Sequence, residues 1–113
     1  KMKILFTAKG KKWDSLIDSR FGRTDFFFIY DEDKDEIEIY DNRSTANEAH
    51  GVGPKTAQKV SKYKPDVIIT GNGPGGNARR ILNEGDYEVF VGAGNLTIKE
   101  AYKKYKHNEL DKF

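Results

Sequence analysis

Short apolar runs along the chain predict five β-strands. Residues 2–8, 25–30 and 66–70 are almost continuously apolar, as expected of strands that are covered on both faces. Residues 87–91 form the last predicted strand. Residues 37–42 alternate apolar and polar side chains, which favours a half-exposed strand at the edge of the sheet. The charged segment in front of this edge strand predicts a hairpin turn.

Helical spacing appears after the third predicted strand and marks three helices. The first helix starts at Pro54, which suits a first helical position, and ends before Pro65. The second helix carries Ala78, Ile81 and Leu82 at positions i, i+3 and i+4. These spacings place one apolar face on each helix, so both helices are expected to pack on the sheet.

The last helix has the clearest start signal in the chain. Thr97 and Glu100 fit a capping box, in which each side chain accepts from a free backbone N–H of the first turn. Ile98 and Ala101 begin its apolar face. The predicted order βββαβαβα over residues 1–113 indicates a single α/β domain with a mixed sheet and helices on its faces.

Composition narrows the classes of function. The 113 residues include no cysteine, which excludes disulfide frameworks, zinc ribbons and clusters held by thiolates of this chain. Twenty Lys and Arg residues oppose 18 Asp and Glu residues with the signs mixed along the chain, so we expect no nucleic-acid partner. The apolar stretches are too short for a membrane span or a signal peptide, which predicts a cytoplasmic protein with no membrane partner.

Glycines cluster where ligands bind in such folds, beyond the carboxyl ends of parallel strands. Gly71, Gly73 and Gly76 spell G-x-G-x-x-G between a strand and a helix. Pro74 removes one N–H from this loop and no acidic residue closes the next strand, which argues against a dinucleotide. Two interpretations stay open: the N–H groups of residues 71–77 hold another anionic ligand, or the glycines only permit a tight turn.

His50 is the candidate metal ligand of the chain. It lies in a polar, glycine-containing stretch just before the first predicted helix, where a histidine is either a ligand or simply solvated. Residues 31–36 resemble the start of a calcium loop but lack the glycine that such a loop needs. No recognisable nucleophile pairs with His50 and the first strand has no carboxylates, which disfavours hydrolase and nuclease chemistry.

Several short motifs occur in an order that resembles the dinitrogenase iron-molybdenum cofactor biosynthesis family, the NifX/NifY type of cofactor carriers. They are MKILFTA, the FGR of Phe21–Arg23, residues 50–53, DVIITGNGPGGNARRIL and TIKEAYKKY. The resemblance covers nearly the whole chain and implies a ribonuclease H-like α/β/α fold with a five-stranded mixed sheet. Two features depart from the family pattern: Arg20 stands where a histidine is frequent, and cysteine is absent.

The resemblance implies a nitrogen fixation-related carrier and not an enzyme, with no catalytic residues. It implies transient binding of an iron-sulfur or iron-molybdenum cluster, or a precursor, and transfer to metal-cofactor assembly proteins by a monomer or weak homodimer. The cofactor-binding residues that it implies come from two loops, with His50 as the metal ligand: Arg20, Phe21, Gly22, Arg23, Asn72, Gly73, Gly75, Gly76, Asn77 and Arg79. Because one imidazole is the only such ligand nearby, no tightly held cluster is expected.

Two other classes of function stay open beside the carrier. The glycine loop 71–77 suits a nucleotide or phosphometabolite. Alternatively, the predicted edge strand 37–42 pairs with a partner protein, although the charged Glu38 and Asp41 disfavour such pairing.

Overall fold

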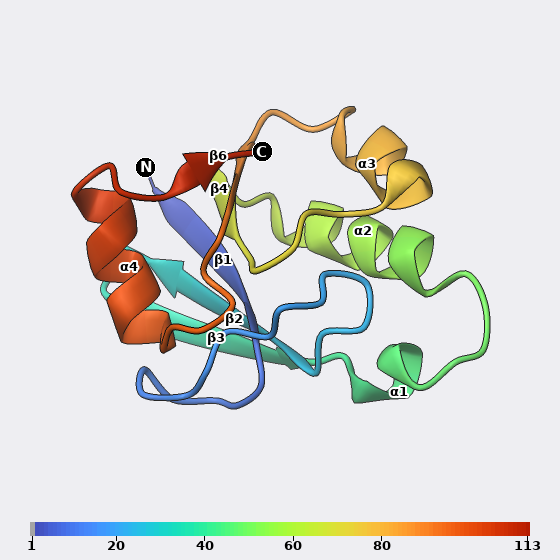
Figure 1. Ribbon diagram of the computed structural model, residues 1–113, viewed down its shortest axis with the longest axis horizontal. Coiled ribbons are helices and arrows are strands. Elements are labelled where there is room, and N and C mark those ends of the chain that lie inside the picture. The colour runs from blue at the N-terminus through green and yellow to red at the C-terminus, as the bar shows by residue number, and fades with distance from the viewer. Residues whose placement is uncertain (1) are drawn as a thin grey trace.

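A six-stranded mixed sheet forms the centre of the molecule in a computed structural model that describes residues 2–113 (Figure 1). The strand order is β3-β2-β1-β4-β5-β6. Strand β1 runs parallel to β4, and β4 to β5, whereas the other neighbours are antiparallel. The strands are β1 (Lys3–Ala8), β2 (Phe26–Asp31), β3 (Glu36–Asp41), β4 (Val67–Ile69), β5 (Glu88–Val91) and β6 (Asp111–Lys112).

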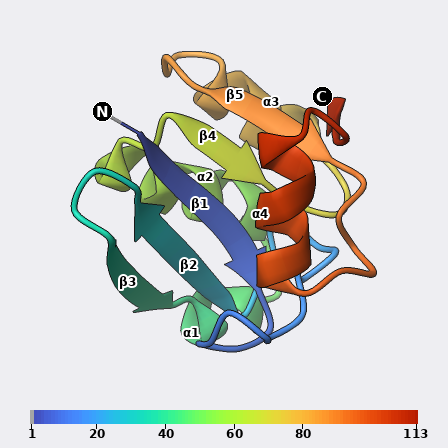
Figure 2. The ribbon, with the colours of Figure 1, turned by 90° about the vertical axis from the view of Figure 1, so that its left-hand side faces the viewer.

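Helices cover both faces of this sheet. Helix α4 (Ile98–Lys106) lies on one face, and α2 (Val52–Tyr63) and α3 (Gly76–Leu82) lie on the other (Figures 1 and 2). Helix α1 (Arg43–Ala46) is a single short turn after β3. The α/β class with a mixed sheet is thereby confirmed, and the relationship to ribonuclease H stays a prediction.

Side-chain alternation along the central strands explains why these strands are apolar throughout. In β1, Ile4 and Phe6 pack with Ile98 on the α4 side of the sheet. The intervening Leu5 packs with Val60 on the α2 side. All five side chains are fully buried, so each face of the sheet has its own apolar core.

The sheet contains one strand more than predicted, so the five-stranded prediction was wrong. The extra strand, β6, consists of two exposed charged residues, with Lys112 opposite Phe90 of β5. Backbone pairing with the free edge of β5 makes this segment a strand, because its own side chains carry no apolar pattern. Helix α1 was also not predicted, since a four-residue helix has too few positions to show a period.

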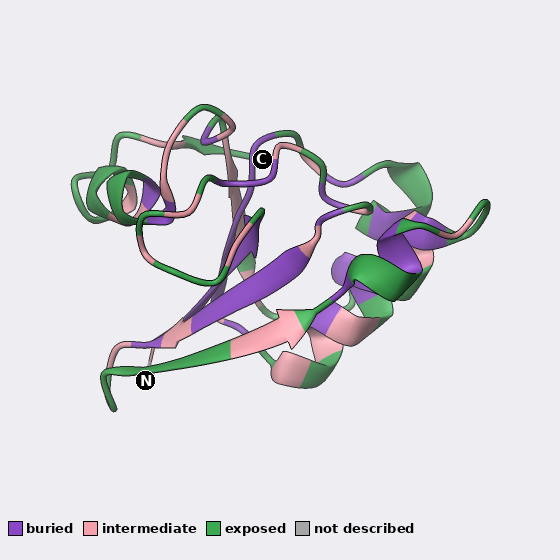
Figure 3. Ribbon diagram, turned by 90° about the horizontal axis from the view of Figure 1, so that it is seen from below, coloured by how far each residue is buried: buried purple, intermediate pink, exposed green. Residues whose placement is uncertain are grey.

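The edge position of β3 and the turn before it were predicted correctly. Strand β3 is largely exposed beside the buried β2 (Figure 3). In the turn, the Asp31 Oδ1 atom accepts from the backbone N–H groups of Asp33 (3.1 Å) and Lys34 (3.3 Å). Asp35 takes the left-handed conformation at φ 52°. These contacts are those of a tight turn closed by an aspartate side chain.

Helix α4 begins with the predicted capping box. The Thr97 Oγ1 atom accepts from the Glu100 N–H at 3.1 Å, and Glu100 Oε1 accepts from the Thr97 N–H at 2.9 Å. These bonds lower the pKa of the Glu100 carboxyl group. Across residues 2–113, none of the helices combines the length and apolarity needed to cross a lipid bilayer.

We expect Thr97→Ala to lower the free energy of unfolding by about 1 kcal/mol, because the Glu100 N–H loses its acceptor. Urea denaturation measures this change. Thr97→Ser keeps the hydroxyl group and should stay much closer to the wild type. Equal losses in both variants would show that the capping bond is not what stabilises the start of α4.

Candidate functional site

The carboxyl ends of the parallel strands bring three loops together at one edge of the sheet. The loop after β1 meets the loop after β4 where the Asn72 N–H donates to the Ser19 carbonyl at 2.7 Å. The loop after β5 joins them where the Gly92 N–H donates to the Gly71 carbonyl at 2.9 Å. This edge is where ligands bind in folds of this class.

Backbone packing at this edge is so close that it requires glycine. A Cβ atom added to Gly71 would lie 2.6 Å from the Ser19 Cα atom and 3.0 Å from the Gly94 Cα atom. Because both neighbours are backbone atoms, no side-chain rotation can relieve such a contact. Gly71 therefore holds the three loops at contact distance, and its role is structural.

A second close approach joins the FGR segment to the helices on the α2 side. A Cβ atom on Gly22 would lie 3.0 Å from the Gly53 Cα atom in the first turn of α2. A Cβ atom on Gly53 would in turn lie 3.5 Å from Ala78 Cβ in α3. The structure thus places the FGR segment, the segment that carries His50 and the start of α3 side by side.

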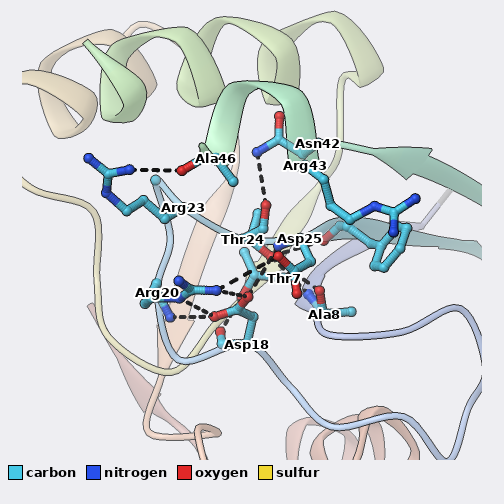
Figure 4. A network of polar contacts seen from close by, with 12 residues as sticks. Thr7, Ala8, Asp18, Arg20, Arg23, Thr24, Asp25, Asn42, Arg43 and Ala46 are labelled. Carbon is cyan, nitrogen blue, oxygen red and sulfur yellow. Dashed lines mark hydrogen bonds and ion pairs between the residues drawn. The ribbon is translucent and has the colours of Figure 1, made fainter. Parts of the chain in front are cut away.

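Asp18 organises the loop that leads into the FGR segment (Figure 4). Its buried carboxylate accepts from the backbone N–H groups of Arg20 (3.0 Å) and Asp25 (3.1 Å). It also accepts from Nε and Nη2 of Arg20, each at 3.0 Å. The side-chain bonds to Asp18 raise the pKa of Arg20. The predicted anion-binding Arg20 is therefore already paired with a carboxylate.

Sequence reasoning missed Asp18, although the chain carries a local signal for it. The pattern Asp-x-Arg recurs at Asp41 and Arg43 with the same set of bonds. There the Arg43 side chain and N–H lower the pKa of Asp41 to about 2. The two pairs differ in burial, because Asp18 is fully buried and the Asp41 side chain is 47% exposed. An aspartate two residues before an arginine thus marks a closed turn in this chain.

The next two predicted residues have opposite surroundings. Phe21 is buried in the core on the α2 side, where it anchors the loop rather than facing a ligand. Arg23 is exposed, and its Nη1 atom donates to the carbonyls of Ala46 (2.8 Å) and Glu48 (3.1 Å) (Figure 4). Because carbonyl acceptors carry no net charge, these two bonds do not neutralise the positive charge of Arg23. The same bonds tie the segment before His50 to this edge.

The glycine loop after β4 is only partly open. No atom lies within 4 Å of a Cβ built on Gly75 or Gly76. A Cβ on Gly73, in contrast, would lie 2.0 Å from Cε1 of Phe113, whose ring covers that glycine. The Arg79 guanidinium stands 4.8 Å from the centre of the same ring. The open part of the predicted cradle is therefore Gly75 and Gly76, together with the exposed Asn72 and Asn77.

His50 is exposed in the segment between α1 and α2. Across the described part of the chain, no three His, Cys, Asp or Glu side chains come together in a way that could hold a metal ion. A metal ion at this edge would thus find one imidazole and no carboxylate or thiolate cluster around it. The His50 assignment stays a prediction.

A hollow of about 740 Å³ lies at the opposite, amino-terminal ends of the parallel strands, where Asp66 and Tyr87 precede β4 and β5. None of the predicted site residues lines it. Its polar groups include the hydroxyls of Ser61 and Tyr87, which lie 3.4 Å apart. The loops at the carboxyl edge, and not this hollow, therefore contain the predicted residues.

Comparison with known proteins shows the family and the fold of the chain. A family model described as "Dinitrogenase iron-molybdenum cofactor" matches residues 2–108. No curated protein matches the chain significantly. The apo form of the orange protein from Desulfovibrio gigas is 29% identical, with a TM-score of 0.91 over 100% of this chain and 94% of that chain. A Thermotoga protein provisionally described as a NifB protein is 28% identical, with a TM-score of 0.83 over 99% and 93% of the two chains.

We expect Gly71→Ala to destabilise the protein by about 1–3 kcal/mol, because the new methyl group meets two backbone segments. Gly76→Ala is the matched control, since its methyl group enters open space. Both substitutions restrict the unfolded chain equally, so the difference between them reports the close approach. Thermal unfolding measures both, and equal stability of the two variants would contradict the packing argument.

We expect Asp18→Asn to cost about 2 kcal/mol, because a buried carboxylate with four donors becomes an amide. Asp41→Asn removes the same charge from the exposed copy of the pattern and should have a much smaller effect. Denaturant unfolding of both variants gives the comparison. A loss at Asp41 as large as that at Asp18 would mean that burial is not the cause.

Proposed function

This chain belongs to the dinitrogenase iron-molybdenum cofactor family, and on that premise we propose that it is a non-catalytic carrier of an anionic metallocluster. The cargo would be an iron-sulfur or iron-molybdenum cluster, or a precursor of one. The orange protein of Desulfovibrio gigas is described in an apo form, which indicates that this relative has a ligand to lose. We extend that property to this chain, with metal-cofactor assembly proteins in the cytoplasm as the donors and acceptors of the cargo.

The observation that carries the proposal is the convergence of three segments at the carboxyl edge. The close contacts from Gly22 to Gly53, and from Gly53 to Ala78, bring the FGR segment, the His50 segment and the glycine loop together. These are the segments that the family resemblance implies as binding residues. Residues that lie far apart along the chain are thus brought to neighbouring positions, which supports a shared binding surface.

The chemistry of this surface suits a polyanionic cargo. Arg23 supplies a positive charge that is held only by carbonyl oxygens. The exposed backbone of Gly75 and Gly76, and the amides of Asn72 and Asn77, supply hydrogen-bond donors for sulfide or phosphate-like anions. Arg20 contributes less than predicted, because Asp18 already compensates its charge. Arg79 stacks on Phe113, and its exposed guanidinium group adds a further positive charge beside the glycine loop.

The ligand set favours a weak grip. The chain has no cysteine and offers His50 as the imidazole at this surface. One imidazole provides a single metal bond, and the hydrogen bonds and one or two arginines add electrostatic contacts only. Four thiolates usually hold such clusters. A cargo held in this way can be passed on quickly, which is what a carrier requires. We propose that the carrier is a monomer or a weak homodimer.

Anoxic titration with a water-soluble synthetic iron-sulfur cluster tests the proposal, with visible absorption as the readout. We expect Arg23→Gln to weaken binding roughly fivefold, because one uncompensated charge is lost. Arg43→Gln removes an equal charge from an arginine that is paired with Asp41, and should leave binding unchanged. His50→Ala should alter the absorption of the bound cluster, whereas His107→Ala should not.

Two results would contradict this proposal. The first is the absence of cluster binding by the wild-type chain. The second is an equal response of the His50 and His107 variants, which would remove the ligand assignment.

A nucleotide or phosphometabolite at loop 71–77 is the second candidate function, favoured by the open backbone at Gly75 and Gly76. Thermal-shift measurements with nucleotides separate the two, since a ligand at 100 times its Kd adds about 2.7 kcal/mol of stability.

A further inference from the structure

A nearly apolar hollow lies on the α4 side of the sheet, away from α2, α3 and the proposed cargo surface. It has a volume of about 380 Å³ and is lined by Trp13, Tyr102, Lys99 and Lys103. The loop after β1, which carries Trp13, runs beside α4 (Figure 1). The two are joined where the Lys99 N–H donates to the Trp13 carbonyl at 2.9 Å.

The aromatic floor of this hollow is held in place by the core. The ring of Trp13 packs edge-on against Phe28 at 4.9 Å and Tyr30 at 5.0 Å between ring centres. Tyr102 lies 5.6 Å from Trp13 and its hydroxyl donates to Glu32. Trp13 and Tyr102 are only half-buried, although such packing gives them little freedom. A partner that inserts a side chain here would not have to order the floor first.

Lys99 is placed unfavourably for the helix itself. It lies four residues before Lys103 on α4, and like charges at this spacing repel each other. Lys99 also lies in the first turn of the helix, the end at which the helix dipole disfavours a cation. Two nearby carboxylates have other partners as well: Glu100 closes the capping box and also attracts Lys103, and Glu32 pairs with Lys106 at 3.0 Å. Both lysines are exposed, and they line an apolar hollow.

We propose that this hollow is a docking surface for an acidic segment of a partner protein. An apolar side chain of the segment would occupy the space between Trp13 and Tyr102, and flanking carboxylates would pair with Lys99 and Lys103. Half-exposed tryptophan and tyrosine are the residues that most often anchor protein interfaces, and rim charges select the partner. Because none of these residues belongs to the cargo surface, the proposal does not rest on the proposed cargo.

Charge balance favours a protein segment over a nucleic acid. A nucleic acid needs a basic track along its backbone, whereas this chain has a net charge of +2 with both signs mixed. The charges of the hollow also favour a partner protein over a second copy of this chain in a symmetric dimer. Two copies that met through this hollow would bring Lys99 and Lys103 of each close to those of the other.

The test uses the full chain and the fluorescence of Trp13, which is its only tryptophan. The probe is the peptide acetyl-Glu-Glu-Leu-Phe-Glu-Glu-amide, which lacks tryptophan. We expect this peptide to shift the Trp13 emission with a saturable curve. The matched peptide with lysine in place of glutamate should have no effect. The double variant Lys99→Ala/Lys103→Ala should weaken binding of the acidic peptide about tenfold.

The control variant is Lys34→Ala/Lys62→Ala, which removes two exposed lysines that do not line the hollow and should bind within about twofold of the wild type. Circular dichroism verifies that both double variants are folded. The proposal is overturned if the acidic peptide leaves the emission unchanged, or if the two double variants weaken binding equally. Tighter binding of an oligo-dT strand than of the peptide, or self-association that Lys99→Ala/Lys103→Ala abolishes, would also overturn it.

Discussion

The hydrogen bonds of the buried Asp18 carboxylate are the interactions on which the carboxyl edge of this sheet depends. Asp18 is held through its main chain as well, because its N–H donates to the Thr7 carbonyl at 2.9 Å and its own carbonyl accepts from the Thr7 hydroxyl at 2.8 Å. The Thr7 hydroxyl also lies 2.7 Å from that of Thr70 at the end of β4. Two parallel strands and the loop between β1 and β2 thus meet at one fully buried polar cluster, where every lost bond would leave an unsatisfied group.

The same aspartate fixes the position of the FGR segment. The carboxylate of Asp18 receives the N–H groups on both sides of the FGR segment, at Arg20 and Asp25. Between these two anchors, Phe21 enters the core and Gly22 approaches α2. Arg23 is then the first side chain of the segment that remains exposed with its charge uncompensated by a carboxylate. The geometry of the proposed cargo surface therefore follows from a residue that does not belong to it.

The parts of the fold that were predictable from sequence are those determined by local pattern. The buried strands follow from apolar runs, and the start of α4 follows from Thr97 and Glu100. Strand β6 could not be predicted, because its conformation comes from the edge of β5 and not from its own side chains. For the same reason the site was only partly predictable. The order of the loops was visible, whereas the cover that Phe113 forms over Gly73 joins residues 40 positions apart that no local pattern relates.

The two sides of the sheet that end in the outer strands β3 and β6 differ in their exposure to solvent. Strand β6 shields one edge, whereas β3 leaves its outer backbone groups free at the other. The free edge carries Glu36, Glu38 and Asp41, and charges of this kind disfavour side-by-side pairing with a strand of a neighbouring molecule. Arg43 lowers the pKa of Asp41 to about 2, so Asp41 keeps its charge at a lower pH than an unpaired aspartate does. The charged outer strand β3 therefore disfavours pairing with the sheet of another molecule, a property that concerns many molecules in solution and not the fold of one.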